Sequence, residues 1–195
     1  MAKLYFSYAA MNAGKSTILL QAAYNYRERG MDVLLLTSAL YKDDDAGHIS
    51  SRIGISADAT LYTNETDLFS LVKNRQAEHR IDAIFVDEAQ FLTKDQAWQL
   101  ARVADRLDVP VLAYGLRTDF RGELFEGSAA LLAIADSLRE VRTICECGRK
   151  ATMVARLGPD GKALTEGDKV SIGKSVYVSL CRRHWEERMG RQPPA

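Results

Sequence analysis

One short segment near the N-terminus constrains the fold of this chain more than any other. Residues 9–16 read Ala-Ala-Met-Asn-Ala-Gly-Lys-Ser, follow the apolar run Leu4–Tyr8 and precede a helical pattern from Ser16 that Gly30 closes. Apart from Ala9, which replaces the first glycine, the segment matches the phosphate-binding pattern GxxxxGKS/T. In such a loop, backbone N–H groups surround phosphate oxygens, the lysine reaches the β- and γ-phosphates, and the serine ligates Mg²⁺. The segment therefore predicts a strand, a phosphate loop and a helix in direct succession.

A second nucleotide-binding element follows the apolar run Ala83–Val86, where two carboxylates, Asp87 and Glu88, stand side by side. At the end of a buried strand next to a phosphate loop, Asp87 is expected to hold Mg²⁺. Glu88 is then free to act as a base. It has two candidate roles, which are to orient water in an ATPase or to take a proton from a substrate hydroxyl in a kinase.

Alternation of strand and helix patterns predicts the fold class. Runs of strand length are apolar on both faces, which is typical of a buried parallel sheet, and helical patterns lie between them. The expected strands are Leu4–Tyr8, Val33–Thr37, Ala83–Val86, Val109–Tyr114 and Leu138–Ile144, and the expected helices are Ser16–Arg29, Asp67–Glu78, Thr93–Leu107 and Glu126–Ala135. Thr93 and Gln96 have the spacing of a capping box. We expect an α/β fold in which helices flank a parallel sheet, as in P-loop NTPases.

The three cysteines and one histidine near the C-terminus have the spacing of a metal site. Cys145 and Cys147 form one short pair, and Cys181 and His184 form a second one 33 residues further on. Two such pairs that close a loop suit a tetrahedral Zn²⁺ with a structural role, although buried free thiols beside an unrelated histidine are the alternative. Short β-type segments at Ala151–Leu157, Val170–Ile172 and Val176–Leu180 lie between the pairs. We therefore expect a nucleotide-binding domain at 1–143 and a zinc-binding module at 144–195.

Composition limits the kinds of molecule that the chain is expected to bind. Lys plus Arg and Asp plus Glu both number 26, so the formal net charge is zero, and 47% of residues are hydrophobic. This balance favours a small-molecule partner over nucleic acid or an anionic membrane. The chain has no apolar run of the roughly 20 residues that span a bilayer, and its first residues lack the features of a signal peptide. We expect a cytoplasmic protein without a membrane partner.

Taken together, these motifs resemble the type II thymidine kinases, the bacterial and cytosolic deoxynucleoside kinases. The resemblance covers essentially the whole chain. It rests on Met11–Ser16, Asp87–Phe91, Tyr114–Gly122, the Cys145 and Cys147 pair, and Tyr177 ahead of Cys181. It implies transfer of the ATP γ-phosphate to the 5′-hydroxyl of thymidine or deoxyuridine, with Mg²⁺, a homotetrameric assembly and feedback inhibition by dTTP.

The resemblance also implies a role for each candidate site residue. Glu88 matches the catalytic base, and Phe120 and Phe125 match aromatic positions around the base of the nucleoside. A zinc-tethered lasso loop that binds thymine, largely through main-chain groups, is implied by Val170, Ser171, Ile172, Gly173 and Lys174 together with Tyr177. The residues implied for ATP and Mg²⁺ are Ala9, Ala10, Met11, Asn12, Ala13, Gly14, Lys15, Ser16, Asp87, Glu88, Ala89 and Gln90. The ligands implied for Zn²⁺ are Cys145, Cys147, Cys181 and His184.

Alternatives remain open for several of these residues and for the function. Phe120, Phe125 and Tyr177 are also consistent with ordinary core packing. Arg52 resembles an arginine near the phosphates but is equally consistent with an exposed ion pair. Asp43–Asp45 stands in a loop where many members of the family have an Asp-x-Arg pattern, so we assign it no contact with ATP. The competing function is a P-loop ATPase coupled to nucleic acid or a protein partner, and a regulatory nucleotide-binding protein without turnover is a third.

Overall fold

A computed structural model describes residues 1–41, 47–169 and 176–190 and confirms the predicted α/β fold class. Six strands form one sheet in the order β5-β2-β6-β7-β1-β8, and every neighbouring pair is parallel. The strands are β1 Leu4–Ala9, β2 Val33–Ser38, β5 Thr60–Tyr62, β6 Ala83–Val86, β7 Val111–Leu116 and β8 Ser137–Glu140. The central strands β1, β6 and β7 carry the phosphate loop, the acidic pair and the Tyr114–Gly122 motif at their carboxyl ends. Motifs far apart in sequence therefore meet at one edge of the sheet.

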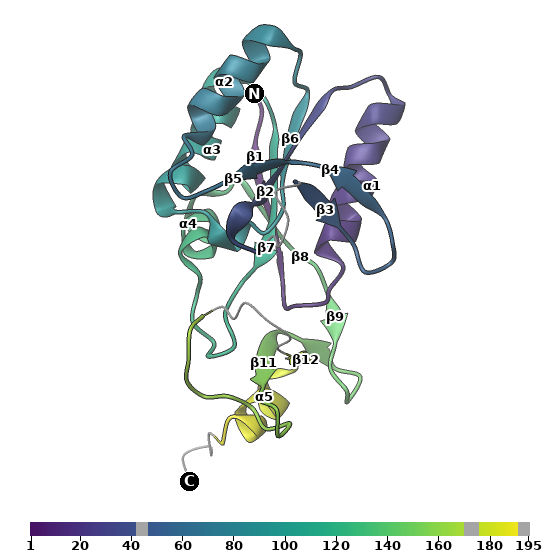
Figure 1. Cartoon of the computed structure of the whole chain (residues 1–195), viewed down its shortest axis with the longest axis vertical. Coiled ribbons are helices and arrows are strands. Elements are labelled where there is room, and N and C mark those ends of the chain that lie inside the picture. The colour runs from purple at the N-terminus through teal and green to yellow at the C-terminus, as the bar shows by residue number, and fades with distance from the viewer. Residues whose placement is uncertain (42–46, 170–175, 191–195) are drawn as a thin grey trace.

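Helices cover both faces of the sheet (Figure 1). Helix α1, Lys15–Glu28, lies on one face together with the hairpin of β3, His48–Ser50, and β4, Ser56–Asp58. The other face is covered by α2 Leu68–Glu78, α3 Lys94–Leu107 and α4 Glu126–Ile134. Two apolar cores result, one on each side of the sheet, as expected for strands that are apolar on both faces. Short 3₁₀ turns η1, Ala39–Tyr41, and η2, Ala89–Phe91, follow β2 and β6.

The capping box predicted for α3 is confirmed, and α2 also begins with a side-chain cap. The Asp67 carboxylate accepts a hydrogen bond from the Ser70 N–H at 3.0 Å. Thr93 and Gln96 form the complete capping box, with the Thr93 hydroxyl and the Gln96 side chain each bonded to the other residue's backbone N–H at 3.1 Å. These contacts satisfy backbone donors that a helix start leaves without partners.

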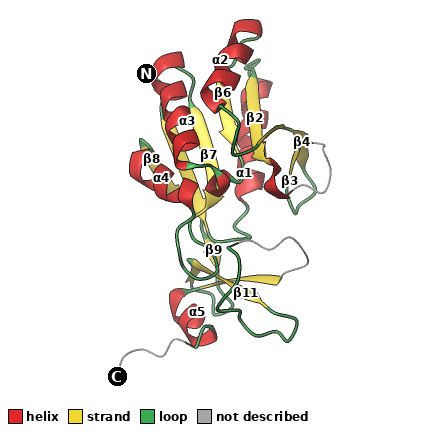
Figure 2. Ribbon diagram, turned by 60° about the vertical axis from the view of Figure 1, so that its left-hand side comes forward, coloured by secondary structure: helices red, strands yellow, loops and turns green. Residues whose placement is uncertain are grey.

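The C-terminal part forms a small separate layer below the sheet (Figure 2). It contains β9 Thr143–Ile144, β10 Lys150–Ala151, β11 Met153–Leu157, β12 Val176–Leu180 and α5 Arg182–Arg188. A third apolar core lies here, around Ala155, Leu180 and Trp185. The division of the chain into two domains stays a prediction, as does the position of their boundary at residue 143.

Two predicted strands are wrong in extent. The expected strand Leu138–Ile144 is two strands, because β8 pairs with β1 in the large sheet whereas β9 pairs with β10 in the small layer. The segment Ala151–Leu157 is likewise divided, and only β11 pairs with β12. The expected strand Val170–Ile172 and the acidic run Asp43–Asp45 lie outside the described residues. Within the described ranges, no helix has the length and apolar character needed to span a membrane.

Candidate functional site

The phosphate loop connects β1 to α1 in the predicted way. Asn12 and Gly14 have positive φ angles of 62° and 80°, which turn the loop before the helix starts. Ala9 is the last residue of β1, buried and paired with Leu116, and its φ is not positive. The conformational freedom of glycine is therefore not used at position 9, which explains why alanine is accepted there.

Lys15 is buried at the base of this loop. Its Nζ donates a hydrogen bond to the Ala10 carbonyl at 3.4 Å. Burial lowers the pKa of Lys15, and the nearby carboxylates of Glu88 and Asp87 oppose this shift. A cation held between a phosphate loop and two carboxylates is positioned to meet an anionic ligand.

Asp87 and Ser16 form a pair of oxygen ligands beside the loop. The Ser16 hydroxyl donates to Asp87 Oδ2 at 2.8 Å, while the buried Oδ1 of Asp87 has no hydrogen-bond partner within the described ranges. Burial, together with the charge of Glu88, raises the pKa of Asp87 to about 6. A hydroxyl and a buried carboxylate oxygen without a partner fit a hard divalent cation such as Mg²⁺, whose binding would restore the ionised form.

Two side-chain hydrogen bonds fix Glu88, which follows directly, and a third one fixes the side chain that holds its carboxylate. Its backbone is left-handed, with φ 52°, and its carbonyl accepts a hydrogen bond from the buried Tyr62 hydroxyl at 3.3 Å. The Gln90 amide donates to Glu88 Oε2, and Gln90 Oε1 accepts from the Leu116 N–H of β7 at 2.9 Å. A non-glycine residue in this conformation is strained and persists where its surroundings enforce it. The Glu88 carboxylate is therefore held by the sheet rather than left to rotate.

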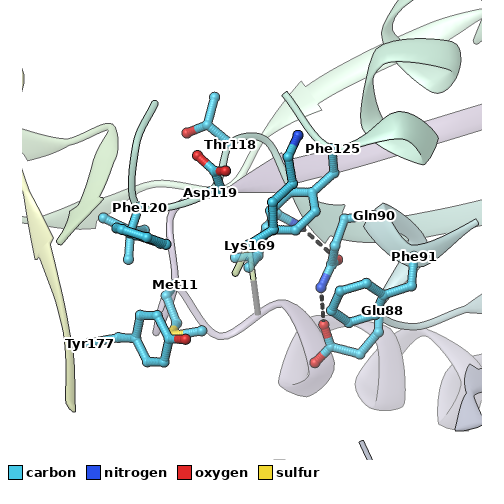
Figure 3. A pocket seen from close by; sticks show the side chains of 12 residues that line it. Met11, Glu88, Gln90, Phe91, Thr118, Asp119, Phe120, Phe125, Lys169 and Tyr177 are labelled. Carbon is cyan, nitrogen blue, oxygen red and sulfur yellow. Dashed lines mark hydrogen bonds between the residues drawn. The ribbon is translucent and has the colours of Figure 1, made fainter. Parts of the chain in front are cut away.

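Two cavities meet at Glu88. The first, about 350 Å³, is the more polar of the two and is lined by residues 11–17 of the phosphate loop, 50–53 of the β3–β4 hairpin, Glu88 and Leu116. The second, about 160 Å³, is mainly apolar and is lined by Met11, Glu88, Gln90, Phe91, Leu116, Thr118, Asp119, Phe120, Phe125, Val154, Lys169 and Tyr177 (Figure 3). Met11, Glu88 and Leu116 belong to both. A carboxylate at the junction can act on a group that reaches from one cavity into the other.

Aromatic rings form much of the second cavity. Phe120 and Phe125 are buried, and Phe125 packs edge-to-face on Phe91, with ring centroids 5.8 Å apart. Tyr177 of β12 is half-buried and reaches the same cavity from the C-terminal part. The three aromatic residues named from the sequence thus come together, although they lie on different elements. An apolar space that aromatic rings line suits a planar heterocycle.

Cys145, Cys147, Cys181 and His184 form one cluster, in which the four ligand atoms lie within 4.8 Å of one another. Desolvation acts against the Cys145 thiolate, but hydrogen bonds from the backbone N–H groups of Cys147 and Cys181 and from His184 lower its pKa to about 6. Thiolate is the form that binds metal. Three sulfurs and one imidazole in this arrangement could hold a tetrahedral Zn²⁺ with no open position, which is typical of a structural site.

The structure separates some residues that the sequence grouped together. Gln90 lines the apolar cavity rather than the phosphate cavity, and Ala10 and Ala89 are buried beneath the site. Arg52 lines the phosphate cavity, as the resemblance implied. Val170, Ser171, Ile172, Gly173 and Lys174 lie outside the described residues. Sequence reasoning missed Tyr62, Thr118 and Lys169, because their places at the site depend on tertiary contacts.

Comparisons with known proteins agree with this geometry. A family model described as thymidine kinase matches residues 2–185. A thymidine kinase of Mesorhizobium japonicum is 63% identical over 100% of this chain and 96% of its own. Thymidine kinases of Rhizobium meliloti, 62% identical over 97% of this chain and 98% of its own, and of Photobacterium profundum, 54% identical over 98% and 100%, are also similar. The chain belongs to the thymidine kinase family.

Proposed function

We propose that this chain transfers the γ-phosphoryl group of ATP to the 5′-hydroxyl of thymidine or deoxyuridine in nucleotide salvage. The observation that carries the proposal is the position of Glu88 between a polar phosphate cavity and an apolar, aromatic cavity. ATP occupies the first with its phosphates on residues 11–16, and the nucleoside occupies the second with its 5′-hydroxyl toward Glu88. This arrangement favours a kinase over an ATPase, which has no use for the second cavity.

Each group then has a defined task. The Glu88 carboxylate accepts the proton of the 5′-hydroxyl as that oxygen bonds to the γ-phosphorus and the bond to the β-phosphate oxygen breaks, so that ADP leaves. Lys15 compensates the charge of the phosphates, and the loop N–H groups orient them. Ser16 and Asp87 would hold Mg²⁺, which neutralises phosphate charge when bound.

The size and lining of the second cavity give selectivity. Phe120, Phe125 and Tyr177 would surround the pyrimidine, and their rings would leave less room for a bulkier purine. Zn²⁺ on the four-ligand cluster would fix the positions of β12 and α5 relative to the large sheet, so that Tyr177 stays at the cavity. The metal has no direct part in the reaction in this scheme.

The test is an assay of ADP release with Mg-ATP and four acceptor conditions, namely none, thymidine, deoxycytidine and single-stranded DNA. We expect release that depends on thymidine and yields thymidine monophosphate. Release that ignores nucleosides but rises with DNA would instead mean that Glu88 activates water.

The same assay tests the catalytic base. Glu88→Gln keeps the shape of the side chain but cannot accept the proton, so we expect kcat to fall by about 10²–10⁴-fold while ATP binding is retained. Glu78→Gln, at the exposed end of α2, is the matched control. A Glu88→Gln enzyme with near-normal turnover would contradict the assignment.

Two further properties, the assembly and the feedback inhibition, follow from the family resemblance, and the location and the excluded partners follow from the composition of the chain. We propose a cytoplasmic homotetramer that has no nucleic-acid or membrane partner and is inhibited by dTTP as end product. Light scattering of the purified protein would measure the assembly, and steady-state kinetics with added dTTP would measure the inhibition.

A further inference from the structure

Arg156 is a buried cation that the scheme above does not use. It lies in β11 directly opposite Tyr177 of β12, and its exposed fraction is only 8%. No carboxylate pairs with it among the described residues, and its Nε has no hydrogen-bond partner there. Burying an arginine without a counter-ion is costly unless other groups compensate the charge. The groups that do so identify its role.

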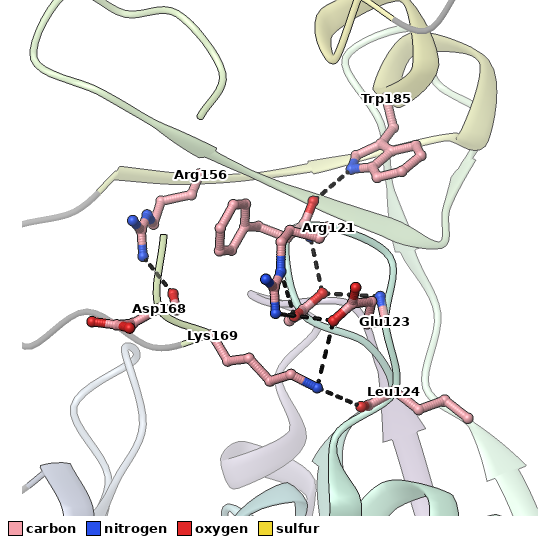
Figure 4. A network of polar contacts seen from close by, with 9 residues as sticks. Arg121, Glu123, Leu124, Arg156, Asp168, Lys169 and Trp185 are labelled. Carbon is pink, nitrogen blue, oxygen red and sulfur yellow. Dashed lines mark hydrogen bonds and ion pairs between the residues drawn. The ribbon is translucent and has the colours of Figure 1, made fainter. Parts of the chain in front are cut away.

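One compensating group is the ring of Phe120, one of the aromatic walls of the apolar cavity. The guanidinium carbon of Arg156 lies 4.6 Å from the centroid of this ring, a cation–π distance. The backbone of Phe120 is fixed separately, because Trp185 Nε1 donates to its carbonyl at 3.0 Å (Figure 4). Trp185 therefore places the residue, and Arg156 restrains the orientation of its ring.

Arg156 also binds the returning limb of the β11–β12 connection. One of its terminal nitrogens donates to the Asp168 carbonyl at 2.9 Å. At Gly167, where φ is 120°, a Cβ atom would lie 2.7 Å from the other terminal nitrogen. The approach of the guanidinium thus depends on a residue without a side chain. Phe120 and Gly167–Asp168, 47 residues apart in sequence, are joined through one side chain.

Lys169 extends this attachment to the other end of the same cavity wall. Its Nζ donates to the Leu124 carbonyl at 3.1 Å and lies 3.7 Å from the Glu123 carboxylate. Leu124 directly precedes Phe125. Residues 167–169 are consequently tied to both ends of the segment that carries the two phenylalanines.

We propose that Arg156 is a positioning residue for the nucleoside, which fixes the plane of the Phe120 ring against the pyrimidine and ties it to Gly167–Lys169. This inference rests on the proposed function, since it takes the apolar cavity as the nucleoside site. Arg156 lines neither cavity, and its described interactions are with Phe120 and Asp168 rather than with Glu88 or the phosphate loop. Its effect is therefore specific to nucleoside affinity.

The test measures thymidine binding by calorimetry without ATP and steady-state kinetics for both substrates. In Arg156→Met we expect the Kd and KM of thymidine to rise about tenfold, as for the loss of a desolvated cation–π contact. In Arg156→Lys, which keeps a cation but loses the planar fork, we expect a smaller rise. For both variants kcat at saturating thymidine and the KM of ATP should stay within about twofold of wild type.

Lys162→Met is the matched control, because Lys162 lies on the same connection with an exposed side chain away from Phe120. It should leave the Kd of thymidine unchanged. If Arg156→Met does not fold, as judged by circular dichroism and zinc content, Arg156→Lys decides the outcome.

Thymidine affinity within about twofold of wild type in the folded Arg156 variants would overturn the proposal. So would a loss of kcat and ATP affinity in proportion to the loss of thymidine affinity, since that indicates a general structural defect. Wild-type protein that binds no thymidine would overturn the proposed function itself, and this inference with it.

Discussion

Asp87 illustrates how one residue couples a binding role to stability. It follows the fully buried strand β6, so its carboxylate is placed where water is scarce and where Glu88 adds a second negative charge. The resulting pKa of about 6 lies above the ordinary value of 3.8. Between these two values the native state binds more protons than the unfolded chain, so stability falls as the pH rises through this window.

The first prediction follows from this sign. Asp87→Asn keeps the oxygen that accepts from Ser16 but carries no charge, so above about pH 6 we expect the free energy of unfolding to rise by about 3 kcal/mol. The gain should shrink as the pH is lowered toward 4, and Mg²⁺-dependent activity should be lost. Chemical denaturation of metal-free protein at several pH values measures this.

Asp105→Asn, at an exposed position of α3, serves as the control for Asp87→Asn. The difference in free energy of unfolding between this variant and wild type should not increase with pH. A gain in Asp87→Asn that is the same at every pH would mean that charge burial is not its cause.

The second prediction concerns Gln90, which connects the Glu88 carboxylate to the backbone of β7. In Gln90→Glu one carboxylate oxygen still accepts from the Leu116 N–H, but the other faces Glu88 without a proton to donate. Two adjacent carboxylates hold a shared proton to higher pH, and a protonated Glu88 cannot act as base. We expect the acid limb of the kcat profile to move up by about one pH unit or more.

Gln90→Leu separates this charge effect from loss of positioning. It removes the donor without adding a charge, so kcat should fall while the acid limb stays in place. If Gln90→Glu leaves the acid limb of the kcat profile where it is in wild type, the side chain at position 90 does not face the Glu88 carboxylate.

At this scale the sequence predicted motif residues better than their supports. Lys15, Ser16, Asp87 and Glu88 follow short local patterns whose chemistry is the same in many proteins. Gln90 depends instead on a strand 26 residues away, and Arg156 depends on the ring of Phe120. Such contacts exist only once the chain is folded, so no local sequence pattern predicts them.

At the scale of elements, the capping box of α3 links a sequence signal to tertiary structure. Beyond its bond to Thr93, the buried Gln96 side chain donates to the Thr63 and Thr66 carbonyls at 2.7 and 3.0 Å, in the segment before α2. One side chain thus provides hydrogen-bond partners both for the start of α3 and for the segment before α2. Helix starts were predictable because capping is local, whereas the break between β8 and β9 was not, because it depends on which sheet each segment joins.

The third prediction tests this cap. Thr93→Ala removes the oxygen that accepts from the Gln96 N–H, so we expect a loss of about 1 kcal/mol in the free energy of unfolding with little change in kcat. Thr93→Ser keeps the hydroxyl and should lose much less. Urea denaturation of the two variants gives the comparison, and equal losses would indicate that the missing methyl group, not the cap, matters.

At the scale of the whole molecule, the two cavities depend on different parts of the chain. Among the described residues, the phosphate cavity is lined only by the part of the chain before residue 144, whereas the apolar cavity also takes Val154, Lys169 and Tyr177 from the C-terminal part. That part has its own core, which includes Cys145, Cys181 and Trp185. Within the described part of the chain, one hydrogen bond joins it to the phosphate loop, from the Ser179 hydroxyl to the Met11 carbonyl.

The fourth prediction follows from this difference between the two cavities. The C-terminal part is too small to be stable on its own core alone, so metal binding should supply much of its folding free energy. Removal of zinc by a chelator, or Cys181→Ser, should therefore raise the Kd of thymidine by about tenfold or more and change the Kd of ATP by less than about threefold. Metal analysis should find about one zinc per chain in the native protein.

Two controls make this result specific. Ser179→Ala removes only the hydrogen bond to the phosphate loop and should leave zinc content unchanged, and returning Zn²⁺ to chelated wild type should restore thymidine binding. Metal-free protein with normal affinity for both substrates would show that the cluster does not support the nucleoside site. Equal losses for ATP and thymidine would show that the C-terminal part stabilises the whole molecule rather than one cavity, because only the apolar cavity takes side chains from it.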